Sequence, residues 1–443
     1  MVKRSIAIIG ALVFVLGACG GGGGAAEMTK GCSKEGEKAQ SADGAPLECV
    51  MNSAGELMWD AEGKSSMTGG TPQNLQAVFG GECNADGPKT YSSGIGDASQ
   101  FSYIDPLGAM ISTHITPVDH IYVYYPQGSE NSAVGTFALT APADGTIVSV
   151  EDFRKTNDYP YPDYRVVIAH SCDLYSVFIH VGELQGAAAE AATAAASSGS
   201  WSGSIPVKAN EVIADDSQSP GFDFSTFASN AKTEMINPDS YQSKESWKPY
   251  TANPFDYFPT EVTTAYEAKS VRAASPVGGT IFHDIDGTAQ GVWFVKGSNG
   301  YSGIGDQKAS YNNHGKVAHG YWDTHLAFAP HHVDAKTFIY SIGDWEGCPC
   351  QFMSVGNVDP SKVQAGSEPT VVDLAEYEFV APDGSRMDPN RPVKGYSLKA
   401  GSQVVGSIAF QVNSDGTMTV EKRPGKVAST FTGFSADALT YVR

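Results

Sequence analysis

Short runs of β-branched and aromatic residues, bounded by proline, glycine and aspartate, recur along the chain from about residue 100 onward. Early examples occupy residues 121–125, 145–150, 164–168 and 205–214. Runs of this length and composition between turn-forming residues are typical of β-strands. Because they follow one another at short intervals, we expect a mainly β, antiparallel domain over residues 96–265.

Residues 186–200 interrupt this pattern with an alanine-rich segment that ends in Ser-Ser-Gly-Ser. Alanine favours helix, but the segment has no apolar stripe that could dock on the rest of the domain. We therefore expect either a short exposed helix or a loop inserted between strands. Further along, residues 253–258 (Asn-Pro-Phe-Asp-Tyr-Phe) predict a docking turn.

A second β-rich domain is expected over residues 266–443. The runs that indicate it lie at residues 278–282, 291–295, 326–328, 337–342, 407–412 and 417–420. An Asp-Gly turn at 284–287 separates the first two runs and predicts a hairpin. The Ser-Asp-Gly turn at 414–416 separates the last two and predicts another.

The N-terminus has the pattern of a secretory signal. Lys3 and Arg4 precede an apolar run at residues 6–16, which is too short to cross a hydrocarbon core of about 30 Å. The exit, Leu16-Gly17-Ala18-Cys19, resembles the lipobox of bacterial lipoproteins. That resemblance implies a signal peptide at residues 1–18 and a lipidated Cys19 that anchors the protein outside the cytoplasm. The alternative is an ordinary secretory signal that is cut nearby.

Residues 19–95 are rich in glycine, serine and alanine and predict a flexible tether. Beyond Cys19, six cysteines remain, an even count that suits disulfides outside the cytoplasm. We expect Cys32 and Cys49 to staple a small hairpin in the tether. Cys348 and Cys350 are too close in sequence for an easy mutual disulfide, which favours partners elsewhere or a thiolate metal site.

The formal net charge of −20 argues against nucleic-acid binding, which requires a basic surface. It also disfavours direct adhesion to anionic lipid. Acidity of this size is otherwise typical of a protein kept soluble outside the cell.

Histidines are concentrated in two stretches, and the first lies within an ordered series of motifs. The series comprises His114-Ile115-Thr116-Pro117-Val118-Asp119-His120, Ala141-Pro142-Ala143-Asp144-Gly145-Thr146-Ile147-Val148, His170, Tyr175 to His180, Val207 to Ile213, and Gly221-Phe222-Asp223-Phe224. This succession resembles the lysostaphin/LytM-type zinc endopeptidases, small antiparallel β domains that cut peptide bridges in peptidoglycan.

The resemblance implies a zinc site in which His114, Asp119 and Asp223 are ligands and His180 is the assisting histidine. In that chemistry zinc activates a water molecule at an open coordination position. Two departures oppose catalysis. His114 and Asp119 are five residues apart where the family has four, and Gly221 stands where the family has a histidine base.

Three functional readings follow. The first is a non-catalytic lipoprotein whose degenerate peptidase-like groove binds peptidoglycan or another envelope polymer, with His120 and His170 as further binding residues. The second is a zinc-dependent cell-wall endopeptidase with altered ligands. The third is a structural surface scaffold on an unrelated β-sandwich, in which the histidines are only hydrogen-bonded.

The second histidine stretch covers residues 314–332 and includes Asp323 and His325. Its histidines lack helical spacing, which disfavours a metal site, although Asp323 and His325 could supply ligands. Aromatic residues accompany them, including Trp293, Tyr321 and Trp322. Such rings suit either stacking on sugar faces or burial in a core.

Overall fold

The structure is a computed structural model, and the described residues fall in two compact units, within Leu16–Gln73 and Asn74–Arg443. It describes residues 38–40, 46–51, 57–61, 74–126, 137–154, 161–195, 198–216, 219–231, 234–304, 310–311, 317–388 and 391–443. The predicted signal peptide, Cys19 and the glycine run at residues 20–24 lie outside the described residues. Within the described parts, helices are all too short or too polar to cross a membrane.

The smaller unit contains a three-stranded antiparallel sheet in the order β1-β2-β3. The strands are β1 (Lys38–Gln40), β2 (Pro46–Met51) and β3 (Leu57–Ala61). Cys49 lies on β2 opposite Trp59 of β3. Cys32 lies outside the described residues, so the Cys32–Cys49 disulfide stays a prediction.

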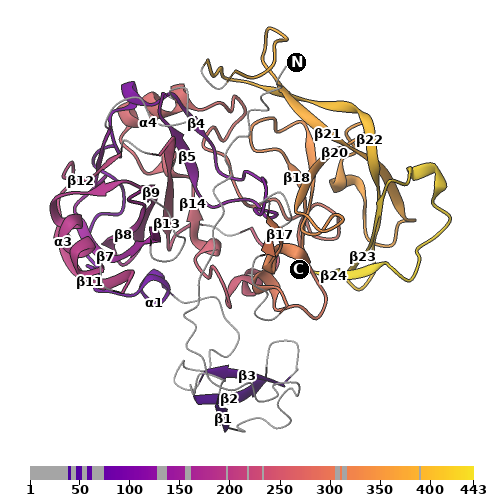
Figure 1. Ribbon diagram of the computed structural model, residues 1–443, viewed down its shortest axis with the longest axis horizontal. Helices are drawn as coiled ribbons and strands as arrows, with labels where there is room; N and C mark the ends of the chain where they lie inside the picture. Colours follow the sequence, from indigo (N-terminus) through magenta and orange to yellow (C-terminus); the bar gives the residue numbers. More distant parts are fainter. Residues whose placement is uncertain are drawn as a thin grey trace. The chain divides into compact units, whose positions relative to one another are not determined.

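The larger unit contains an eight-stranded antiparallel sheet, here called the large sheet (Figure 1). Its path runs β11-β7-β8-β9-β13-β5-β4, and β14 pairs with β13. The strands are β4 (Tyr103–Asp105), β5 (Ile121–Tyr124), β7 (Gly145–Asp152), β8 (Tyr164–Ser171), β9 (Leu174–Val181), β11 (Ser200–Val207), β13 (Gly221–Ala228) and β14 (Thr251–Ala252). The predicted mainly β architecture is confirmed.

A second, three-stranded sheet and a short helix pack around one end of the large sheet. The sheet has the order β10-β12-β6 and comprises β10 (Glu183–Leu184), β12 (Val212–Asp216) and β6 (Phe137–Thr140). Helix α3 (Gly186–Ala195) follows β10 and buries Ala188, Ala191 and Ala195. These residues are three and four positions apart and therefore share one face of the helix. Their small side chains form a docking stripe, which was not expected from the sequence. The helix is therefore docked, not merely exposed.

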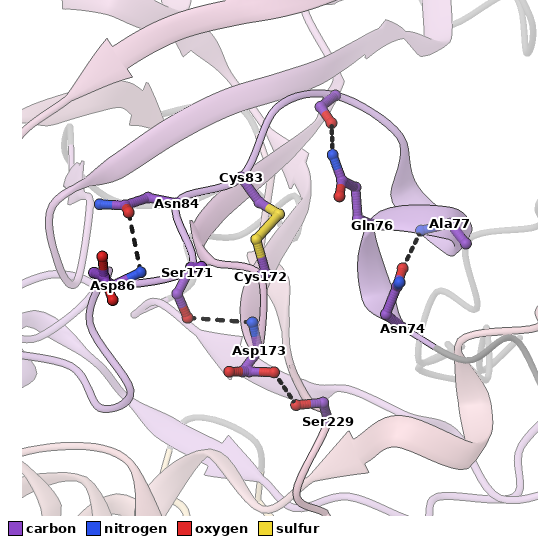
Figure 2. The surroundings of a disulfide bond; sticks show 12 residues. Asn74, Gln76, Ala77, Cys83, Asn84, Asp86, Ser171, Cys172, Asp173 and Ser229 are labelled. Carbon is purple, nitrogen blue, oxygen red and sulfur yellow. Dashed lines mark hydrogen bonds between the residues drawn. A yellow bond between two sulfur atoms is a disulfide. The ribbon is translucent and has the colours of Figure 1, made fainter.

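The expected tether ends earlier than residue 95, because residues from 74 onward pack on the large sheet. Leu75, at the start of helix α1 (Leu75–Phe79), is fully buried. Cys83 is disulfide-bonded to Cys172 in the turn between β8 and β9 (Figure 2). The neighbouring backbone is joined by Cys172 N–H, which donates to Asn84 O at 3.2 Å. This disulfide, which the sequence left unassigned, fastens the segment to the sheet.

Residues 278–282 do not form a strand, so the hairpin predicted around 284–287 is wrong. Ile281 instead packs into the core of the large sheet. Helix α4 (Thr260–Lys269) precedes this segment in the chain. The hydroxyl of Tyr266 on this helix accepts a hydrogen bond from Ile95 N–H at 2.8 Å. The docking turn is confirmed, since Phe255 and Phe258 are buried.

The C-terminal part is a closed barrel of antiparallel strands, drawn in orange and yellow in Figure 1. Its strands are β15 (Gly291–Val295), β18 (His325–Pro330), β19 (Phe338–Ile342), β20 (Cys350–Ser354), β21 (Thr370–Val380), β22 (Ser397–Val412), β23 (Met418–Pro424) and β24 (Leu439–Val442). The short pair β16 (Ser310–Tyr311) and β17 (Val317–His319) lies outside this ring. The β22–β23 hairpin is the one predicted from the turn at 414–416. Trp293, Phe328 and Phe410 are fully buried inside it.

Candidate functional site

Two histidines face one buried carboxylate at the junction of β5, β9 and β13. Asp223 lies on β13, between Tyr122 of β5 and Ile179 of β9. Its Oδ2 is 3.5 Å from Nε2 of His120, which immediately precedes β5, and 3.9 Å from Nε2 of His180 on β9. All three residues are at most 7% exposed. The sequence stretches that carry these residues, far apart in the chain, are thus brought together.

A second carboxylate orients each imidazole ring. Nδ1 of His120 donates to Asp119 at 3.1 Å, and Nδ1 of His180 donates to Asp163 at 3.0 Å. Because a carboxylate only accepts, each Nδ1 carries the proton and each Nε2 is directed at Asp223. We refer to Asp119, His120, Asp163, His180 and Asp223 as the histidine–aspartate cluster.

His180 reaches this cluster through a local break in the strand. Its φ of 62° is in the left-handed region, which residues with a side chain seldom occupy. The pairing of β8 with β9 shifts there, from Tyr164 opposite Val181 to Arg165 opposite Ile179. His180 is therefore the extra residue of a β-bulge, a device that re-aims a side chain and is frequent at functional sites.

The pKa shifts in the cluster run in the direction that favours a proton held between His120 and Asp223. Burial alone would lower the pKa of His120, but Asp223 and Asp119 outweigh that effect and the pKa is raised. Burial raises the pKa of the Asp223 carboxyl, against the opposing influence of His120 and His180. A close contact between Nε2 of His120 and Asp223 Oδ2 is favourable only when one of them is protonated, which agrees with both shifts.

Asp119 is turned away from Asp223 and toward the segment after β13. One oxygen accepts from Nε1 of Trp247 at 2.7 Å. Burial alone would raise the pKa of Asp119, but the positive charge of the buried Lys248 and the donors His120 and Trp247 hold it well below its usual range. Asp119 is thus an ionised, fully engaged acceptor.

The expected zinc ligands do not assemble. Among the residues that the structure describes, His, Cys, Asp and Glu side chains form no group of three or more that could hold a metal ion. The ring of His120 lies between the two carboxylates, and Asp119 is engaged by Trp247. His114 stands beside His120, with ring centroids 6.0 Å apart, and burial followed by the charge of His120 lowers its pKa to about 3. The set His114, Asp119 and Asp223 therefore does not fit a zinc site.

Gly221 occupies the position where the resemblance would place a histidine base. A Cβ added there would lie 2.2 Å from the carbonyl oxygen of Val123 on β5. Real Cβ atoms do not approach backbone so closely, and Gly221 is paired with Tyr124 in the sheet. The close approach of β5 excludes any side chain at this position.

A pocket of about 150 Å³ opens beside the cluster, between the large sheet and the barrel. His114, His180 and Asp223 are among its lining residues, whereas Asp119 and His120 are not. Tyr103, Tyr122 and Tyr124 line it from the large sheet, and the rings of Tyr103 and Tyr124 stack at 4.4 Å. Tyr377, Phe379 and Tyr396 line it from the barrel side. We call this the tyrosine pocket.

A close contact between a histidine and an aspartate links the two sides of the tyrosine pocket. Nε2 of His332, which follows β18 of the barrel, lies 3.0 Å from Asp105 at the end of β4. Both residues line the pocket. The pair fixes the distance between the two walls, and nothing in the local sequence of either residue pointed to it.

The other predicted site residues take structural roles. His170 is buried, with Nδ1 3.1 Å from the Asp144 carbonyl and Nε2 2.8 Å from the Ser176 hydroxyl, so it is not a binding residue of the pocket. In the second histidine stretch, Nε2 of His325 donates to the backbone carbonyl of Tyr301 at 3.1 Å. Asp323 accepts a hydrogen bond from Nδ1 of His319 at 2.9 Å. Asp323 and His325 therefore do not form a joint site.

The chain matches no protein-family model, no curated protein and no solved structure. The resemblance to the lysostaphin/LytM-type endopeptidases consequently stays a prediction.

Proposed function

We propose that this protein is an extracytoplasmic lipoprotein that binds, without cleaving, one sugar unit of peptidoglycan or of another envelope polymer in the tyrosine pocket. In this proposal residues 96–265 are a degenerate lysostaphin-like domain, and the barrel completes the pocket. The observation that carries the proposal is the pocket itself, with tyrosine and phenylalanine side chains on both walls and imidazole and carboxylate groups among the lining residues.

This combination suits a sugar because a pyranose ring has apolar faces and a polar edge. Aromatic rings such as Tyr124 and Tyr377 supply flat apolar surfaces together with a hydroxyl group. His180 and Asp223 supply a few convergent polar groups, as is usual in pockets that are otherwise apolar. An amide or hydroxyl of the ligand would pair with them.

Three features of the described residues support the absence of cleavage. The side chains that the resemblance implies as zinc ligands do not converge, and Gly221 cannot be replaced by an imidazole without displacing β5. His120 and His180 are both committed to carboxylates through Nδ1. The cluster is therefore better suited to donating and accepting hydrogen bonds than to activating water.

Ligand binding is tested by titrating the purified protein with N-acetylglucosamine and with a peptidoglycan disaccharide, monitored by calorimetry. Tyr377→Ala should weaken binding about fivefold, because loss of one stacking ring costs roughly 1 kcal/mol. Tyr257→Ala is the matched control, since Tyr257 is also half-buried but does not line the pocket. No binding of either sugar by the wild type would overturn the proposal and favour a structural scaffold.

Anchoring is tested separately by Cys19→Ser. If Cys19 carries the lipid, the variant should move from the membrane fraction to the soluble extracytoplasmic fraction of a bacterial host. Cys350→Ser is the matched control and should leave the distribution unchanged. Continued membrane association of the Cys19→Ser variant would contradict the anchor while leaving the sugar-binding proposal intact.

A further inference from the structure

Cys348 and Cys350 point at each other across a single proline. Their Sγ atoms are 2.9 Å apart, and both cysteines are free and only partly buried. A disulfide needs about 2.05 Å, so less than an ångström of movement separates the contact from a bond. The expectation that these two cysteines find partners elsewhere is therefore wrong.

No competing thiol is in place among the cysteines whose side chains the structure describes. Cys83 and Cys172 already form a disulfide. Among these four described cysteines, Cys348 and Cys350 therefore face only each other.

The backbone on both sides holds the pair in this arrangement. A tight turn precedes it, in which Glu346 and Gly347 both have positive φ and Trp345 N–H donates to Cys348 O at 2.8 Å. Pro349 fixes φ between the two cysteines. Cys350 then begins β20, paired with Ile342 of β19. Because the chain is ordered before any bond forms, closing the small ring costs little further conformational entropy.

The hydrogen bonds give the two sulfurs different roles. The Cys348 thiol donates to the carbonyl of Trp345 at 3.2 Å, so the proton between the sulfurs comes from Cys350. Burial, followed by this hydrogen bond, raises the pKa of Cys350 well above its usual range. Because Cys350 is thereby kept protonated, it is the poorer first nucleophile, and Cys348 is left as the sulfur that attacks first.

We infer that Cys348-Pro349-Cys350 is a reversible dithiol–disulfide site that exchanges with small-molecule disulfides. The Cys348 thiolate attacks one sulfur of the oxidant, forms a mixed disulfide and releases one thiol. Cys350 then loses its proton and attacks the Cys348 sulfur, which closes the ring and releases the second thiol. In total two protein thiols become a disulfide and the oxidant is reduced to two thiols, so atoms and electrons balance.

The test uses the full chain equilibrated with oxidised glutathione, quenched with a thiol-alkylating reagent and analysed by peptide mass spectrometry. The wild-type peptide that contains both cysteines should lose two hydrogen atoms and resist alkylation, and dithiothreitol should restore both thiols. Cys350→Ser, which lacks the resolving thiol, should instead accumulate a glutathione adduct at Cys348. Cys348→Ser should form its adduct at Cys350 at least about tenfold more slowly than Cys350→Ser forms its adduct at Cys348, because Cys350 remains protonated.

Two results would overturn the inference. One is a wild-type peptide that keeps two alkylatable thiols after equilibration, while the Cys83–Cys172 disulfide of the same sample stays intact. The other is equal adduct formation in the two serine variants, which would show that the hydrogen bonds do not differentiate the sulfurs. Denaturation curves of the two serine variants, recorded beside these measurements, show that both are folded under the conditions of the exchange reaction.

Discussion

At position 221 the backbone of β5 passes so close to β13 that a single added carbon has no space. The nearest atom to a Cβ would be the Val123 carbonyl oxygen, a fixed member of the sheet. Relief therefore requires the two strands to separate, which disturbs the pairing of Gly221 with Tyr124. The same close approach removes the site that a histidine base would need.

Gly221→Ala and Gly221→His should both destabilise the fold by about 1–3 kcal/mol, as is usual for overpacked positions, and neither should produce peptidase activity. Chemical denaturation measures the first effect, and digestion of peptidoglycan in the presence of zinc measures the second. Gly401→Ala is the matched control, because Gly401 also lies in a strand but its added Cβ would be 3.2 Å from the nearest atom. A Gly221→His variant that is stable and hydrolytic would contradict the assignment of this position.

The residues of the histidine–aspartate cluster were only partly predictable. His120, His180, Asp119 and Asp223 were identified because they belong to an ordered motif series. Asp163, which orients His180, was missed, since an aspartate before a strand is a common turn residue and carries no distinguishing signal. The left-handed φ of His180 was likewise invisible, because the bulge depends on the register of β8 against β9.

At the scale of elements, the strands were predictable where alternation or a continuous apolar run was bounded by turns. The runs at 121–125, 145–150 and 164–168 correspond to β5, β7 and β8. The segment 278–282 has the same composition but packs as irregular chain beside Leu107, with an isolated bridge from Leu107 to Gly279. Local propensity indicates that such a segment is buried, but tertiary packing decides whether it pairs.

Helix α3 was misjudged for a different physical reason. Large apolar residues usually mark the docked face of a helix, whereas the buried face of α3 consists of Ala188, Ala191 and Ala195. Small side chains let a helix backbone approach a neighbouring element closely, so an alanine stripe can dock without any leucine or phenylalanine. The α-helical spacing of three and four residues is present in the sequence, but in an alanine-rich segment it does not stand out.

For the molecule as a whole, no local sequence pattern indicates that the tyrosine pocket needs both β parts. Its walls come from β4 and β5 on one side and from β21 and Tyr396, which precedes β22, on the other. The Asp105–His332 pair spans them. Contacts between segments more than 200 residues apart depend on how finished domains pack, which local patterns do not encode. The pocket is therefore a property of the assembled unit.

Buried histidines in several parts of that unit make its stability depend on pH. Burial lowers the pKa of His170 to about 4, and burial together with Arg272 lowers that of His283 to about 4. Burial lowers the pKa of His325 to about 3. The folded protein keeps these rings neutral, while the unfolded chain takes up protons near pH 6.5. Stability is thus fully present above about pH 6.5 and is lost as the pH falls toward 4.

The slope of unfolding free energy against pH, measured by denaturation between pH 6.5 and 4.5, should therefore be positive. Each such histidine contributes at most about 1.4 kcal/mol per pH unit. His170→Gln should reduce the slope by up to that amount even if the variant is less stable throughout, because glutamine does not titrate. His319→Gln is the control, since the side chain of His319 is 45% exposed. The comparison uses slopes, so a difference in absolute stability does not affect it. Identical slopes for His170→Gln and the wild type would show that the His170 ring takes up its proton equally in the folded and unfolded states. That result would contradict the buried position of the ring between Asp144 and Ser176.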